Sequence, residues 1–266
     1  MLAEQSLQQG SPTEALARLQ EQVKKDPSNP KLRVFLFQLL SVLGQWERAQ
    51  TQLKVSAELD AANLLMAQMY REAILCELFR AEVFAGKRSP LVFGDPESWI
   101  ALLVEALRLD CESRFADAQS LRNQALQQAP ATAGMLDDRA FAWIADADNR
   151  LGPILEAIVN GRYYWIPFGR IAKLEIEAPT DLRDLVWTPA QFTWVNGGGA
   201  SGLIPTRYPD SEASQDAQIQ MSRKTEWMEY FEGSFRGIGQ RLLTTDVDEY
   251  ALMDVRKIEF SLPQGS

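Results

Sequence analysis

The feature that most constrains the fold is an internal repeat near the start of the chain. The stretch GSPTEALARLQEQVKKDPSNP, which starts at Gly10, aligns without a gap with GQWERAQTQLKVSAELDAANL, which starts at Gly44. The aligned pairs are Gly10 with Gly44, Ala15 with Ala49, Leu19 with Leu53 and Asp26 with Asp60, and each pair is 34 residues apart. A fixed period of this length indicates supersecondary units stacked one on the next.

The 34-residue period is that of the tetratricopeptide repeat, a helix-turn-helix unit. Glycine suits the turn between the two helices, the repeated alanine lets the helices approach, and the leucine one turn later fills the space between them. Proline after Asp26 ends the second helix, because proline disfavours helical geometry in the residue before it. A weaker third copy, SRFADAQSLRNQALQQAP, starts at Ser113. We therefore predict about six stacked helices over residues 1–130, one of them long and irregular at 64–86.

Stacks of this kind present a concave surface that holds a peptide or a helix. The alternative is an inert scaffold with no specific partner. One candidate binding site is the inner face of the stack around Val34, Gln38 and Ser41.

After Pro130 the sequence changes to short apolar runs separated by turn residues. Asn160-Gly161 lies between ILEAIV and RYYWIPF and predicts a hairpin. RIAKLEIEAP alternates apolar and polar residues as a half-buried strand does, and two further strands flank the glycine-rich NGGG. We predict an α+β fold, in which residues 1–130 form the tetratricopeptide-like helical domain. Residues 131–266 form a small, mostly-β domain, an SH3-like barrel or a curved sheet.

The segment NGRYYWIPFGR, residues 160–170, concentrates aromatic side chains on one strand. Successive side chains alternate between the two faces of a strand, so Tyr163 and Trp165 share one face and Tyr164 and Ile166 the other. Rings on both faces predict that the strand is covered on one side by its own domain and on the other by the helical half or by a bound partner. Both readings, structural core and partner contact, stay open, and Phe168 belongs to the same candidate set.

A second candidate is the loop SGLIPTRYPDSE, where Arg207 and Tyr208 lie between two prolines. A rigid and exposed loop is a common place for binding residues. The predicted partner-binding residues are therefore Tyr163, Tyr164, Trp165, Phe168, Arg207 and Tyr208.

Composition argues against catalysis and against several kinds of ligand. The chain has no histidine, which removes the commonest general base and most zinc and haem sites. Its net charge of −9 disfavours nucleic acid. The run NGGGASG lacks the Gly-Lys-Ser/Thr ending of a phosphate loop. We expect no cofactor, no metal and no catalytic site. No enzyme activity is predicted, although carboxylate chemistry in the β-domain remains a minor alternative.

The N-terminus has no basic segment followed by an apolar core, and no apolar run approaches the roughly 18 residues of a membrane span. Cys76 and Cys111 lie inside helical patterns and form no CxxC motif, as expected for reduced thiols. These features predict a cytoplasmic protein without membrane insertion.

Three segments carry a family resemblance: DNRLGPILE at residues 148–156, GRYYWIPF at 161–168 and LIPTRYPDS at 203–211. Together with the degenerate helical repeats, they resemble the ImpE/TagJ family of accessory proteins of bacterial type VI secretion systems. The resemblance covers essentially the whole chain.

The resemblance implies a non-enzymatic adaptor. It implies binding to a helical N-terminal segment of the small sheath subunit (TssB type) and to the disassembly ATPase ClpV, an AAA+ protein. An amphipathic helix would dock its apolar face into a hydrophobic groove. A general tetratricopeptide-type adaptor or chaperone for another client is the alternative.

Overall fold

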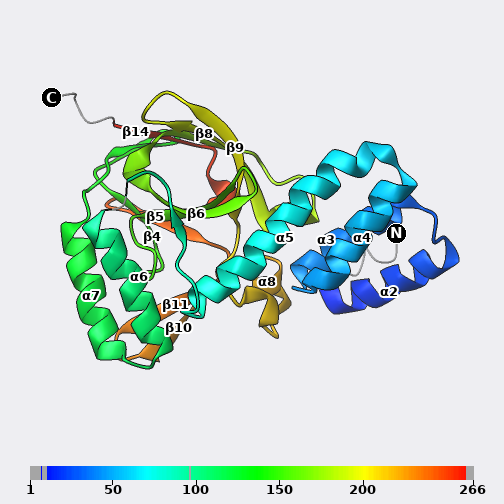
Figure 1. Ribbon diagram of the computed structural model, residues 1–266, viewed down its shortest axis with the longest axis horizontal. Helices are drawn as coiled ribbons and strands as arrows, with labels where there is room; N and C mark the ends of the chain where they lie inside the picture. The colour runs from blue at the N-terminus through cyan, green and yellow to red at the C-terminus, as the bar shows by residue number, and fades with distance from the viewer. Residues whose placement is uncertain (1–6, 8–10, 96, 262–266) are drawn as a thin grey trace.

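The computed structural model describes residues 7, 11–95 and 97–261 (Figure 1). A helical N-terminal part is followed by a part built mostly of strands, which confirms the predicted α+β fold. The described helices of the first part are α2 (Pro12–Lys25), α3 (Pro30–Val42), α4 (Trp46–Leu59), α5 (Leu64–Phe84), α6 (Ser98–Cys111) and α7 (Phe115–Gln128).

The repeated residues occupy equivalent places in the helical stack. Ala15 and Leu19 on α2 are buried, as are Ala49 and Leu53 on α4. Gly44 follows α3 with φ of +65°, a conformation that favours glycine, and so makes the predicted turn. Gly10 lies outside the described residues. The repeat chemistry inferred from the second copy is thus confirmed.

The helix starts follow from local sequence. Ser11 accepts a hydrogen bond from the backbone N–H of Glu14, and Pro12 occupies the first turn of α2. Asn29 caps α3 in the same way by accepting from Lys31 and Leu32. Each cap satisfies backbone donors that the first turn of a helix leaves without a partner.

The predicted helices are present among the described residues, but they do not form a single stack. In Figure 1, α6 and α7 form a hairpin at the left of the molecule, whereas α2, α3 and α4 lie at the right, and α5 runs between the two groups. The weak third repeat copy is α7, in a hairpin with α6. The chain leaves the stack after α5 because β1 (Leu91–Val92) pairs with the sheet before α6 begins.

A nine-stranded sheet forms most of the second part, and Figure 1 shows its strands curling around an interior. That interior holds a cluster of buried apolar side chains. The strand order is β1-β6-β5-β9-β8-β7-β14-β2-β3. Its remaining strands are β2 (Gly134–Leu136), β3 (Arg139–Phe141), β5 (Ile154–Val159), β6 (Arg162–Pro167), β7 (Ile171–Ile176), β8 (Trp187–Trp194), β9 (Gly199–Pro205) and β14 (Lys257–Phe260). Since β1 comes from the helical half, the division into domains 1–130 and 131–266 stays a prediction.

Two small sheets and a short helix complete the fold. The ribbon of β10 (Thr225–Phe231) and β11 (Ser234–Gly239) is one sheet. The other joins β4 (Ile144–Asp146), β12 (Leu242–Thr245) and β13 (Glu249–Ala251). The helix α8 (Ala217–Gln220) follows the predicted loop.

The predicted hairpins are present. Asn160 and Gly161 join β5 to β6 with φ of +50° and +69°, and Val159 pairs with Arg162 across the turn. Positive φ at both turn residues matches the right-handed twist of the flanking strands. The NGGG run joins β8 to β9 as a hairpin tip.

The large sheet separates two hydrophobic clusters. Tyr163 and Trp165 belong to the cluster that contains the helices α2 to α6. Ile166 belongs to the cluster inside the β part, and Tyr164 packs against it. The predicted alternation along β6 is therefore confirmed, and the helical half covers one of its faces.

Candidate functional site

The aromatic residues that face the helices are buried by α5. Tyr163 packs edge-on against Phe79, with ring centroids 6.0 Å apart. Trp165 packs against Phe84 at 6.3 Å. Both of these phenylalanines lie on α5. Of the two covers left open by the sequence, the chain's own helix is the one observed.

The remaining aromatic candidates face the β part. Phe168 is buried against Phe260, with ring centroids 5.9 Å apart. Tyr164 is half-buried and meets Phe93 edge-on at 5.8 Å. Of the four aromatic candidates, only Tyr164 keeps a partly exposed side chain.

The loop that carries Arg207 and Tyr208 is not exposed, which corrects the expectation from its flanking prolines. Both side chains are buried. The Arg207 guanidinium donates to the carbonyls of Val42 at 2.7 Å and Ser41 at 3.1 Å, at the end of α3, and to Gln220 at 2.7 Å. A cation is favoured at the last carbonyls of a helix, so this loop is drawn inward to the helical stack.

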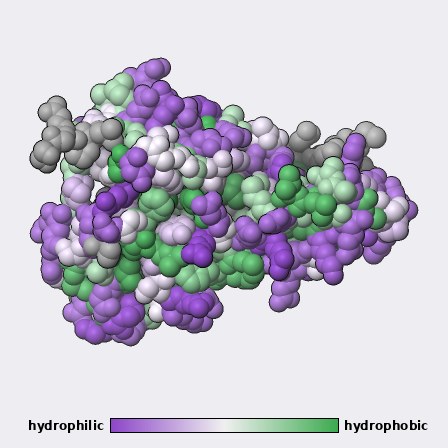
Figure 2. Space-filling model, turned by 45° about the horizontal axis from the view of Figure 1, so that its top comes forward, coloured by the Kyte–Doolittle hydropathy of each residue, from purple (hydrophilic) through white to green (hydrophobic). Residues whose placement is uncertain are grey.

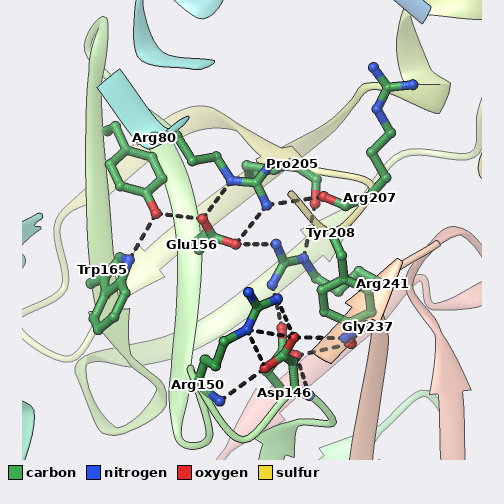
Figure 3. A network of polar contacts seen from close by, with 12 residues as sticks. Arg80, Asp146, Arg150, Glu156, Trp165, Pro205, Arg207, Tyr208, Gly237 and Arg241 are labelled. Atoms are coloured by element: carbon green, nitrogen blue, oxygen red, sulfur yellow. Dashed lines mark hydrogen bonds and ion pairs between the residues drawn. The ribbon is translucent and has the colours of Figure 1, made fainter. Parts of the chain in front are cut away.

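Beneath α5 lies a set of buried charged side chains, most of which Figure 3 shows at close range. We call it the buried charge network, and its members are Glu77, Arg80, Asp146, Asp148, Arg150, Glu156, Arg207 and Arg241. At its centre Glu156 accepts two hydrogen bonds from Arg80, at 2.6 and 2.9 Å. Arg241 and the Tyr163 hydroxyl donate to the same carboxylate. Glu156 thus joins α5 to three parts of the β half.

The network continues into the small sheet of β4, β12 and β13. Asp146 accepts from Arg241 and from the Tyr208 hydroxyl, the latter at 3.0 Å. Asp148 pairs with Arg150 at 2.6 Å. A buried charge is tolerated only when it is paired and hydrogen-bonded, and each of these carboxylates meets that condition.

The two carboxylates that share Arg241 titrate in opposite directions. Burial raises the pKa of Glu156, but the guanidinium groups of Arg80 and Arg241 outweigh burial and lower that pKa to about 2. Burial dominates at Asp146 and raises its pKa to about 6, since Arg241 offsets it only in part. Burial also raises the pKa of the Tyr163 and Tyr208 hydroxyls. Glu156 is therefore charged and both hydroxyls are protonated at neutral pH.

Four of the six predicted site residues meet in this interior. Tyr163 and Tyr208 donate to the network, Arg207 is one of its members, and the Trp165 indole N–H donates to the Tyr163 hydroxyl at 2.8 Å. Tyr164 and Phe168 lie apart from it. Direct contact between these six residues and a partner stays a prediction, and in this conformation five of them are buried within the chain.

The two ends of α5 differ mainly in what they bury, since Leu78 of the second end is also 43% exposed. We call residues 64–76 its outer half and residues 77–84 its inner half. The inner half carries Glu77 and Arg80 into the buried charge network. The outer half exposes 55% of Leu64, 84% of Leu65 and 49% of Leu75. Figure 2 shows hydrophobic surface on the helical half of the molecule.

These leucines line a groove of about 1160 Å³ between α4 and α5, which we call the α4–α5 groove. Its α5 side is formed by Leu64, Leu65, Ala67, Gln68, Arg71, Glu72 and Leu75. Its α4 side is formed by Glu47, Gln50, Thr51, Leu53, Lys54 and Ala57. One wall is thus mainly apolar and the other mainly polar, a surface suited to an amphipathic helix.

The alternative site on the inner face of the stack is partly closed. Val34 and Gln38 line a smaller groove of about 670 Å³, whose far side is formed by residues 180–182 of the β half. Ser41 is buried and holds Arg207 through its carbonyl.

Sequence reasoning missed the outer half of α5 as a candidate surface. The segment LLMAQMYREAILCELF is apolar except at Gln68, Arg71, Glu72 and Glu77, and a helix of mainly apolar composition is normally buried. One signal could have revealed this surface: the mainly apolar helix follows directly after the two clear repeats, where the stack ends.

The described residues contain no group of three or more histidine, cysteine, aspartate or glutamate side chains arranged to hold a metal ion. Within the same residues, no helix combines the length and the apolar character needed to cross a membrane.

Comparison with known proteins identifies the family to which the chain belongs. The ImpE protein family matches residues 138–259, and a tetratricopeptide repeat family matches residues 6–73. The type VI secretion system accessory component TagJ of Pseudomonas aeruginosa is 52% identical over 260 residues, which cover 98% of this chain and 91% of that protein. The chain belongs to the ImpE/TagJ family. The predicted resemblance is confirmed, and the matched families are a repeat family and an accessory-protein family, not enzyme classes.

A solved structure supports the fold of this family member over its full length. The crystal structure of protein VPA1032 from Vibrio parahaemolyticus superposes with a TM-score of 0.90 and covers 99% of each chain. At 24% identity this likeness shows the fold alone.

Proposed function

We propose that this type VI secretion accessory protein is a cytoplasmic, non-enzymatic adaptor. It binds the helical N-terminal segment of the small sheath subunit (TssB type) and links the sheath to the ClpV-type ATPase. The observation that carries the proposal is the α4–α5 groove, where three leucines of one helix face solvent beside a polar wall. An exposed apolar groove with a polar rim is the surface that a helix-binding module presents.

The buried charge network gives the groove its rigidity. Arg80 on the inner half of α5 is held by Glu156 and by the Arg207 carbonyl, at 3.0 Å for the latter. Arg207 in turn holds the end of α3. Because a preformed groove need not be ordered when a partner binds, less of the binding energy is lost. We assign Tyr163, Trp165, Arg207 and Tyr208 this positioning role, while the outer half of α5 contacts the helix.

Isothermal titration with a synthetic peptide of the sheath subunit's N-terminal helix tests the proposal. We expect a dissociation constant on the order of micromolar or tighter, with a negative heat-capacity change from apolar burial. The variants Leu65→Asp and Leu75→Asp place a charge in the groove and should each weaken binding by at least about tenfold, since burying an unpaired charge is costly.

The matched control is Val247→Asp, because Val247 is also an exposed apolar residue, at 55%, but lies on the turn between β12 and β13. Its binding should equal that of the natural sequence. Absence of binding by the natural sequence would reject the sheath helix as the client and favour an adaptor for another protein. The link to the ATPase is tested by immobilising the peptide: the ATPase should be retained only when this protein is added.

A further inference from the structure

The third repeat of the stack begins in register but is not completed. The helix α3 spans Pro30–Val42, and adding the period of 34 gives residues 64–76. The helix α5 does begin at Leu64, yet it continues to Phe84. The outer half of α5 is therefore the first helix of a third repeat.

The second helix of that repeat is missing from its place in the chain. The helix α4 begins at Trp46, and adding 34 gives residue 80. Residue 80 is Arg80, which lies inside α5 and binds Glu156 in the buried charge network. The segment that would turn back and start a second helix is used instead to join α5 to the β half. After α5 the chain passes to β1 rather than back onto the stack.

Burial at equivalent positions shows where the missing helix would pack. Phe37 and Ser41 on α3 are fully buried. Their equivalents 34 residues later are Arg71 and Leu75, which are exposed and line the α4–α5 groove. Other positions of α5, such as Ile74, are as buried as their counterparts on α3. In the preceding repeat α4 packs along α3, while Phe37 also meets Tyr70 of α5. The α4–α5 groove is the face of α5 that has no such neighbouring helix among the described residues.

This end of the stack is only partly polar. Terminal repeats of a solenoid normally carry a polar outer surface that keeps them soluble. Here Leu64, Leu65 and Leu75 are exposed on the face that also carries the polar Gln68, Arg71 and Glu72. Arg71, in the middle of the same face, makes no hydrogen bond or ion pair with any described residue. A helix that covers the leucines and brings a carboxylate to Arg71 would complement both features.

We propose that the α4–α5 groove is the open position of the second helix of the third repeat, and that a partner's helix fills it in trans. The inference rests on the proposed function in assigning a helix to this groove, and it goes further by specifying the chemistry and direction of that helix. The groove continues the stack's own helix–helix interface, so the partner should resemble the helices that occupy the equivalent places.

The helices α2 and α4 occupy the equivalent places and indicate which residues the docked helix should carry. In α2 and α4 a buried alanine is followed four residues later by a buried leucine, Ala15 with Leu19 and Ala49 with Leu53. The docked helix should carry a small residue and a leucine at the same spacing. Since α3 and α4 form an antiparallel hairpin through Gly44, the docked helix should run antiparallel to α5. Its N-terminal end should then lie near Leu75 and its C-terminal end near Leu64.

The test uses the chain's own second-repeat helix as the probe. A synthetic peptide with the sequence of residues 46–59, acetylated and amidated, carries a photo-crosslinker at one end or the other. We expect the N-terminal probe to react with residues around 71–75 and the C-terminal probe with residues around 64–65 and the end of α4. A peptide with Leu53→Asp should bind at least about tenfold more weakly, because a buried leucine is replaced by a charge.

The results test this inference separately from the proposed function. Crosslinks with the two ends exchanged, crosslinks outside the groove, or equal binding of the Leu53→Asp peptide would overturn repeat completion. The same holds if the peptide does not bind while the sheath peptide does. If the peptide of residues 46–59 binds as expected and the sheath peptide does not, the open helix position stands and only the sheath assignment fails.

Discussion

The two halves of α5 reverse the usual distribution of side chains. The inner half buries charges, with Arg80 paired to Glu156 on β5 of the sheet. The outer half exposes leucines, with Leu65 84% accessible to solvent. Both halves belong to one uninterrupted helix, so local helix preference cannot explain the difference. The contacts of the inner half lie within the chain, and we propose that the outer half is shaped by a contact with another molecule.

The contrast separates what stabilises the fold from what is available for binding. A buried ion pair contributes little net stability compared with apolar packing, but removing one partner leaves the other charge unpaired and is strongly destabilising. An exposed leucine contributes almost nothing to folding. Substitutions in the two halves should therefore affect different measurements.

The largest effect is expected at the centre of the buried charge network. Glu156→Gln removes the charge that holds Arg80 and Arg241 and should lower the free energy of unfolding by about 3–5 kcal/mol. Denaturant unfolding followed by tryptophan fluorescence measures it. The control Glu58→Gln, at an exposed position on α4, should change stability by less than about 0.5 kcal/mol. Equal effects at the two positions would remove the distinction between the inner half and an ordinary surface.

The pH dependence of stability should report the titration of the same carboxylate, that of Glu156. The pKa of Glu156 is about 2 in the folded chain against an ordinary value of 4.5, so its ionised form stabilises the folded state. This contribution is complete above pH 4.5 and is lost as the pH falls toward 2. It amounts to roughly 3 kcal/mol. Unfolding curves of the natural chain and of Glu156→Gln between pH 5 and pH 2 should converge; parallel curves would contradict the assignment.

A smaller effect is expected where the β5–β6 turn meets the junction of the two halves. Gly161 has φ of +69°, and a methyl group there would press against the Glu72 carboxylate of α5. Gly161→Ala should cost about 1–2 kcal/mol, mainly from the left-handed backbone. Gly233→Ala is the matched control, with φ of +70° and no atom within 4 Å of the added carbon. Thermal unfolding of both variants should show that Gly161→Ala loses at least as much stability as Gly233→Ala.

The smallest effect on stability is expected in the outer half. Leu65→Ser should change the free energy of unfolding by no more than about 0.5 kcal/mol, because the Leu65 side chain is already exposed to solvent in the folded chain. The same substitution should weaken binding of the sheath peptide. A large loss of stability with unchanged binding would show that Leu65 packs within the chain.

Local patterns predicted much of the fold. The 34-residue offset placed Ala15, Leu19, Ala49 and Leu53 in the helical core, and Asn160-Gly161 marked a hairpin. These signals are local, since each depends on residues close in sequence. The third repeat copy failed because a few matching residue types on α7 do not specify which surface a hairpin packs against.

The candidate site depends on contacts that no local pattern encodes. Arg80 and Glu156 are 76 residues apart, and Arg207 reaches the carbonyl of Ser41 across 166 residues. The prolines beside Arg207 predicted a rigid loop, but rigidity does not indicate exposure. The mainly apolar composition of α5 is typical of a buried helix, and the exposure of its leucines becomes visible only in the folded chain.

Hydrogen–deuterium exchange with and without the sheath-subunit peptide tests the central claim most directly. If the outer half of α5 is the docking surface and the inner half is structural, the peptide should slow exchange in α4 and at residues 64–76. Residues 162–168 and 206–208 should exchange as before. Slower exchange confined to residues 162–168 and 206–208, with none in α4 or α5, would contradict the account and return the binding site to the aromatic strand.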